Sequence, residues 1–152
     1  MGAYAGISNK TNTVSSTVPM FNLRGASTRR LKVFDFLVGC DAAPADQASK
    51  FAFRRTTADG DPLTAFTPTK LDPADGASVA SMDLTWTGAA EPTITGSSDV
   101  LQIALNQRAT NRWIAVPGHE IIIPATSEAG LALMSAVATS PANHAFTITW
   151  EE

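Results

Sequence analysis

The residues with the clearest capacity for chemistry are His119 and Glu120, in the stretch AVPGHEIIIPAT. A histidine beside a glutamate can begin a zinc site of the His-Glu-x-x-His type, where two histidines one helical turn apart face one ion. The fourth residue after His119 is Ile123, however, and the flanking prolines leave too little room for a helix. The sequence therefore predicts a turn at Pro117-Gly118 and a short buried strand over residues 121–123, with the His-Glu pair at its entrance.

Few other residues are candidates for metal binding or nucleophilic catalysis. His144 is the only other histidine, and we expect a partly buried structural side chain there because it begins an apolar strand pattern. Cys40 is the only cysteine, so the chain has no intrachain disulfide and no cysteine-ligated metal site. We expect it to be a small buried hydrophobic residue. The serines of TGSSD, residues 95–99, are explained by a turn that enters a strand.

The carboxylates give no clear site either. Asp72, Asp75 and Asp83 suggest calcium, but their spacing lacks the alternating oxygen ligands and the glutamate at loop position twelve that a calcium loop supplies. The chain has no Gly-x-Ser-x-Gly motif and no glycine-rich phosphate loop, whereas carboxylate pairs that meet only in space stay open. We therefore expect a protein that is not an enzyme, with no catalytic, cofactor-binding or metal-binding residues; its interface residues are left unassigned.

Alternating patterns predict the elements that position these residues. Apolar side chains recur at every second residue in several short segments, separated by Gly, Pro and Asp turns, which is typical of β-strands. The predicted strands cover residues 31–38, 50–57, 81–87, 99–106, 110–116, 120–123, 131–137 and 143–150. No segment carries an apolar stripe at helical spacing over three turns. The sequence predicts an all-β protein built as a sandwich, a jelly roll or a small barrel. Of these we expect a jelly-roll-like antiparallel β-sandwich of about eight strands.

Two regions fall outside this pattern. Residues 1–19 are rich in Gly, Ser, Thr and Asn, so we expect an extended N-terminal arm that precedes a sandwich domain over residues 20–152. The arm is either a flexible terminus or a segment that becomes ordered by pairing with a neighbouring chain. The long segment between Thr57 and Ser81 predicts either a crossover loop or an ordered excursion on one edge. Short helical turns are conceivable at residues 45–50 and 74–80.

The tryptophans lie within strand patterns. Trp86, Trp113 and Trp150 are expected in the core, with a sugar-stacking face or a subunit interface as the alternative. Within the first strand, Phe34, Phe36 and Val38 are predicted on one face and Leu31, Val33 and Leu37 on the other, so that the strand is buried on both sides.

Composition excludes several classes of function. Only 16% of the 152 residues are charged, the net charge is −3, and the longest basic runs are two arginines, so the chain has no footprint for nucleic acid. The sequence contains no apolar run long enough to cross a membrane and no signal-peptide pattern. We therefore expect the protein to be made and used without secretion through a signal peptide. A surface with so few charges suits a protein that is partly covered by other subunits.

The texture and order of several segments resemble small tailed-bacteriophage virion proteins of the capsid decoration or cement family. These segments are NQRATNRWIAVPGHEIIIPATSEAGLAL at residues 106–133, GCDAAPAD at 39–46, LDPAD at 71–75 and TWEE at 149–152. The resemblance implies a jelly-roll homotrimer on the outer surface of an icosahedral head, where it binds the major capsid protein. It carries no catalytic residues over to this chain.

Two other classes of function stay open. A carbohydrate-binding β-sandwich of a phage fibre or receptor-binding head would stack sugars on exposed tryptophans or Tyr4. A small hydrolase would assemble its site from residues that are distant in the sequence.

Overall fold

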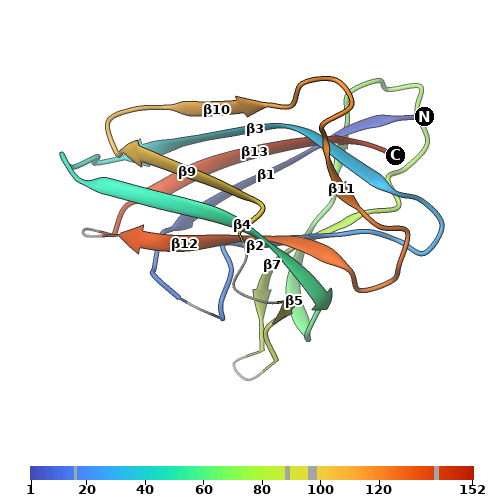
Figure 1. Ribbon diagram of the computed structural model, residues 1–152, viewed down its shortest axis with the longest axis horizontal. Helices are drawn as coiled ribbons and strands as arrows, with labels where there is room; N and C mark the ends of the chain where they lie inside the picture. Colours follow the sequence, from blue (N-terminus) through green and yellow to red (C-terminus); the bar gives the residue numbers. More distant parts are fainter. Residues whose placement is uncertain (16, 88–89, 96–98, 139–140) are drawn as a thin grey trace.

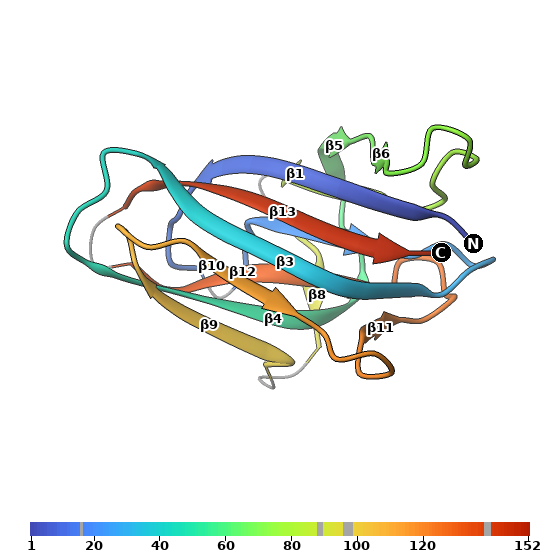
Figure 2. The same ribbon diagram turned by 90° about the horizontal axis from the view of Figure 1, so that it is seen from above.

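The protein is an antiparallel β-sandwich, as Figures 1 and 2 show for the computed structural model. The structure describes residues 1–15, 17–87, 90–95, 99–138 and 141–152, and none of these is helical. The first sheet contains β1 Ala3–Thr11, β3 Leu31–Ala42, β6 Thr69–Lys70, β10 Asn111–Ile114, β11 Ile121–Ile123 and β13 Asn143–Glu151. The second contains β2 Phe21–Arg24, β4 Ala48–Ala58, β5 Pro62–Phe66, β7 Ser81–Trp86, β8 Thr93–Ile94, β9 Leu101–Asn106 and β12 Gly130–Ala138. The predicted all-β sandwich is confirmed.

The strand order pairs early strands with late ones. The first sheet runs β10-β3-β13-β1-β6, with β11 also on β3, and the second runs β5-β7-β2-β12-β4-β8, with β9 also on β4. Consequently β1 pairs with β13, β2 with β12, β3 with β10 and β4 with β9. Two further pairings, β13 with β3 and β12 with β4, join these strand pairs into the two sheets.

The core lies between the sheets and is aromatic. Phe51 and Phe53 from β4 meet Phe146 from β13 and Phe36 from β3, all at most 2% exposed. The rings of Phe36 and Phe53 pack edge to face with centroids 4.8 Å apart, the geometry that aromatic quadrupoles favour. The large apolar residues that alternate along residues 50–57 and 143–150 therefore point inward.

Strand β3 corrects the prediction of burial on both sides. Its pairing with β13 shifts register between Thr149 and Trp150, which leaves one extra residue at Phe34. This bulge exchanges the two faces, so Val33 before it and Phe36 after it both point into the core. Leu37 is 37% exposed and lies on the outer face. The strand is buried on one side only.

The expectation of an extended arm over residues 1–19 is wrong for Ala3–Thr11. These residues form β1, which pairs with β13 over nine residues inside the first sheet. Tyr4 is 2% exposed and stacks on Trp150 with ring centroids 6.3 Å apart. Gly6 completes the inward face, where an added Cβ would lie 2.4 Å from the Met82 sulfur. One aromatic ring and closely packed glycines thus replace the run of large apolar residues that marks most core strands.

The segment between Thr57 and Ser81 is an ordered excursion. It forms β5, which pairs with β7 at one edge of the second sheet, and β6, which pairs with β1 at one edge of the first. Neither helical turn is present, because β4 already begins at Ala48 and residues 74–80 form turns and irregular backbone. The eight predicted strands are confirmed, whereas β1, β2, β5, β6 and β8 were not predicted. No described segment is a helix long and apolar enough to span a membrane.

Candidate interaction surface

The His119-Glu120 pair lies in a turn, as the sequence predicts. The His119 amide donates to the Val116 carbonyl at 2.8 Å, and Gly118 has a φ of 87°, which other residues rarely adopt. The Glu120 carboxylate accepts from the Gly118 amide at 2.9 Å, and this hydrogen bond lowers the pKa of Glu120. The His119 side chain is exposed. The pair therefore closes a turn before β11 and forms no metal site.

His144 is fully buried, more so than expected. Its ring packs edge to face on Phe51 with centroids 5.0 Å apart, and its Nδ1 lies 3.0 Å from the Ala142 carbonyl oxygen. Burial lowers its pKa, which favours the neutral imidazole in the folded protein. Cys40 corrects the prediction of a buried residue, because it is half-buried beside the Ala42 carbonyl, 3.3 Å from its sulfur. Neither side chain is part of a catalytic arrangement among the described residues.

The acidic candidates separate in the structure. Asp83 lies fully buried on β7 and forms an ion pair with Arg24, which also binds Asp59, whereas Asp72 and Asp75 lie in a turn after β6. Burial raises the pKa of Asp83, and the hydrogen bond from Arg24 opposes this effect. No group of three or more His, Cys, Asp or Glu in the described part of the chain could hold a metal ion. Residues 96–98 of the TGSSD stretch lie outside the described residues.

The aromatic side chains are mostly inside. Trp150 is 0%, Tyr4 2% and Trp86 8% exposed, while Trp113 is half-buried against the core. Trp86 also donates from Nε1 to the Asp59 carbonyl at 2.9 Å. The core positions expected for Trp86 and Trp150 are therefore confirmed. None of these four rings lies flat and exposed for sugar stacking.

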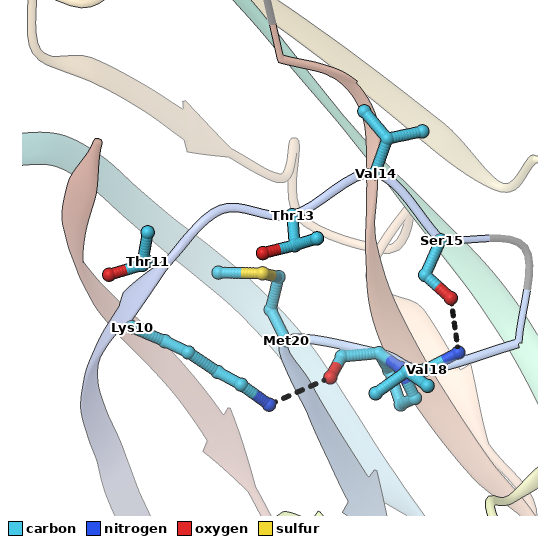
Figure 3. A pocket seen from close by; sticks show the side chains of 8 residues that line it. Lys10, Thr11, Thr13, Val14, Ser15, Val18 and Met20 are labelled. Atoms are coloured by element: carbon cyan, nitrogen blue, oxygen red, sulfur yellow. Dashed lines mark hydrogen bonds between the residues drawn. The ribbon is translucent and has the colours of Figure 1, made fainter. Parts of the chain in front are cut away.

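Lys10 is a partly buried amine that the sequence analysis did not single out. Its Nζ donates to the carbonyls of Pro19, at 3.1 Å, and Leu84, at 2.9 Å, and lies 5.7 Å from the centroid of the Trp86 ring. Figure 3 shows the Pro19 contact beneath the β1–β2 connection, beside a recess of about 320 Å³. Burial lowers the pKa of Lys10. Both hydrogen bonds go to backbone, so Lys10 holds the connection on β7.

The outer face of the second sheet is covered by the chain itself. Ala52, Ala132 and Met134 alternate with core residues and so point away from the other sheet, yet each is at most 1% exposed. The β4–β5 and β7–β8 connections must both pass β12 and β2 to reach their next strands. They meet where the Asp61 amide donates to the Ala90 carbonyl at 2.8 Å. The centre of this sheet, at β4 and β12, is therefore buried on both faces, whereas β5 and β9 keep exposed residues.

The outer face of the first sheet is open instead. One row across its strands consists of Ile7, Thr147, Leu37 and Arg112, the next of Ala5, Thr149, Asp35 and Ile114, and a third of Asn9, Ala145 and Gly39. Ile7 is 53% and Ile114 58% exposed. Small side chains lie between these protruding aliphatic groups. We call these three rows the open face.

The charges on the open face neutralise each other. Asp35 and Arg112 are its only charged residues, and they are bound through two parallel hydrogen bonds of 2.9 and 2.6 Å. Outward faces of antiparallel sheets are normally polar and solvated. A sheet face of small and aliphatic side chains with one closed ion pair costs less to desolvate than a face that carries unpaired charges. The open face is the candidate functional site.

Sequence reasoning left this surface unassigned. Two features of the sequence could have indicated it. The outward positions of β1, and those of β13 before Glu151, contain no lysine or glutamate, and the chain as a whole has a low charge. Comparison with protein-family models, curated proteins and solved structures finds no significant match to this chain.

Proposed function

We propose that this protein is a non-enzymatic structural subunit of a tailed-phage virion, which decorates and cements the icosahedral head by binding the assembled lattice of the major capsid protein. The observation that carries the proposal is the open face, because it offers protein-binding surface where a solvated sheet would carry charge. A ligand that binds only the assembled shell stabilises that shell by mass action. The resemblance of the sequence to decoration proteins supplies the identity of the lattice.

We infer further that the sandwich is a jelly roll. The support is the pairing of β1 with β13, β2 with β12, β3 with β10 and β4 with β9, which is the order of a four-pair antiparallel ribbon wrapped into two sheets. Such a body is rigid and presents its face without rearrangement, so little entropy is lost on binding.

The open face is smaller than a standard interface. Four strands about 4.8 Å apart and five residues of about 3.3 Å each span roughly 19 by 17 Å. That area, about 320 Å², is less than half of the ~800 Å² that each partner buries in a standard interface, so attachment would need contacts beyond these three rows. The homotrimer that the resemblance implies would need a further contact at a three-fold axis.

Cosedimentation with assembled heads tests the role of the open face. Ile7→Lys and Ile114→Lys place charge at its two most exposed aliphatic positions, and each should abolish binding without unfolding the protein. Leu63→Lys is the matched control, because Leu63 is 65% exposed on β5 of the other sheet. If Leu63→Lys releases the protein and the two isoleucine variants do not, the open face is not the contact.

Quantitative mass spectrometry of purified particles tests the location. Hundreds of copies per head, measured against the major capsid protein, are expected for a decoration protein. A few copies would favour the fibre or vertex alternative, and absence from the particle would contradict the proposal. Removal of the first 18 residues cannot test an attachment arm, because it deletes β1.

A further inference from the structure

A recess at one end of the sandwich holds a cation that has no counter-charge. The recess measures about 550 Å³ and lies between the end of β4, the start of β12 and β11, which Figure 1 shows at the same end of the molecule. Arg55 from β4 extends into it, and Arg30, before β3, lies on its wall. This volume is within the range of small-molecule binding sites.

Arg55 differs from every other partly buried arginine in the described part of the chain. Arg24 is bound to Asp59 and Asp83, and Arg54 to Asp99 at 2.7 Å. Arg55 donates only to the Ile122 carbonyl among its described hydrogen bonds. The positions outside the described residues contain no acidic residue, so none of them supplies the missing charge.

The environment of Arg55 disfavours its charge without compensating it. Burial lowers the pKa of its guanidinium, and no neighbouring carboxylate opposes that effect. A guanidinium remains protonated under these conditions because its ordinary pKa is so high. One carbonyl uses one of its five N–H groups, so the planar fork still has donors for a second, anionic partner.

The other residues that line the recess indicate which kind of anion would fit it. Thr57 and Thr95 bring exposed hydroxyl groups, each of which can both donate and accept a hydrogen bond. Ile122, Pro124 and Ala129 add apolar surface to the same lining. Hydroxyl partners together with C–H surface match a ring that carries hydroxyls at its edge and C–H groups on its face.

We propose that this recess binds an acidic sugar of the uronic acid type, with the carboxylate on Arg55, the hydroxyls against Thr57 and Thr95, and a C–H face on Pro124 and Ile122. A bidentate guanidinium–carboxylate pair supplies the orientation. Arg30, at the rim, adds positive potential that attracts the anion. The site uses no aromatic ring and none of the residues of the open face, so it does not depend on the proposed capsid role.

Titration of the full chain with glucuronate, followed by NMR chemical shifts and calorimetry at low salt, tests the site. We expect binding with a Kd near ~1 mM and shifts confined to the residues of the recess. Glucose, which has the same ring without the carboxylate, should bind at least about tenfold more weakly, since a lost charge-assisted hydrogen-bond pair has that effect.

Arg55→Met and Arg54→Met form the matched pair of variants. The two arginines are adjacent on β4, but Arg54 is already bound to Asp99 and does not line the recess. Arg55→Met should weaken glucuronate binding by roughly tenfold or more, and Arg54→Met should leave it within about twofold. Arg30→Met and Thr57→Val, at exposed positions, should each weaken binding and would serve if Arg55→Met does not fold.

Four results would overturn the proposal. Glucuronate shifts outside the recess, or binding that all these variants leave unchanged, would remove the site. Inorganic phosphate that binds as tightly as glucuronate would leave a general anion site. Tighter binding of a short peptide with a free carboxyl terminus would reassign the recess to a protein chain end.

Discussion

The two outer faces of the sandwich differ in what their side chains meet. On the second sheet, Ala132 and Met134 point outward and are still buried, because the chain's own connections cross over them. On the first sheet, Ile7 and Ile114 occupy equivalent outward positions and are more than half exposed. The comparison shows that this chain covers one of its apolar outer faces and leaves the other available for a different molecule.

The largest expected effect comes from placing the same new charge on each face. Met134→Lys puts an unpaired ammonium under the covering connections, and should lower the free energy of unfolding by at least about 4 kcal/mol. Ile7→Lys leaves its ammonium in water and should change that free energy by no more than about 0.5 kcal/mol. Urea denaturation followed by tryptophan fluorescence measures both. Equal losses would mean that the two faces are buried alike.

The ion pair on the covered face provides the second test. Arg24→Met leaves Asp83 buried without its partner and should cost about 3–5 kcal/mol at neutral pH. Because burial raises the native pKa of Asp83, its ionisation destabilises the fold as the pH rises through that pKa. The loss of Arg24 raises the native pKa of Asp83 further. The difference in free energy of unfolding between Arg24→Met and the natural chain should therefore shrink as the pH falls toward ~4.

Urea denaturation at pH ~7 and ~4 measures this change. A deficit that is the same at both pH values would show that Asp83 does not carry the penalty. Arg24→Lys, which keeps the charge without the fork, is the control and should lose less than Arg24→Met at neutral pH.

The sequence was sufficient for the strands whose apolar residues alternate with polar ones. In β4 and β13 the large residues Phe51, Phe53 and Phe146 fall at every second position, so the inward face follows from spacing alone. The turn before β11 was equally readable because only glycine readily adopts the positive φ that follows Pro117.

The rest depended on contacts between distant parts of the chain. Arg54 and Arg55 cannot be told apart by their partners in the sequence alone, because Asp99 and the Ile122 carbonyl each lie more than 40 positions away. The bulge at Phe34 is a mismatch with β13, so it is invisible in β3 alone. The LALM run of β12, by contrast, did carry a signal, since adjacent large apolar residues indicate burial on both faces.

His144 lies buried between the two sheets, and its ionisation should have a smaller, pH-dependent effect on the stability of the fold. Its native pKa is lowered, chiefly by burial, below the ordinary value of 6.5. Just below pH 6.5, His144 therefore binds a proton in the unfolded chain more readily than in the native protein. The stability is fully present above pH 6.5 and falls as the pH drops below it, by up to about 1.4 kcal/mol per pH unit until the native pKa is reached.

His144→Phe, which keeps a ring against Phe51 and Phe146, should flatten the profile below pH ~6.5. His119→Ala is the control, because that side chain is exposed and should leave the slope unchanged. A slope that survives in His144→Phe would assign the acid sensitivity to the carboxylates instead.

The smallest effect is expected on the open face. Arg112→Met removes the partner of Asp35, but the Arg112 side chain is 57% exposed and water can replace its hydrogen bonds. The urea midpoint in ~0.15 M salt should therefore not change resolvably, in contrast to Arg24→Met. The variant should nevertheless weaken attachment to assembled heads, because Asp35 would enter the interface as an uncompensated charge. A variant that loses stability and keeps its attachment would reverse both expectations, and would make the ion pair a support of the fold and not of the open face.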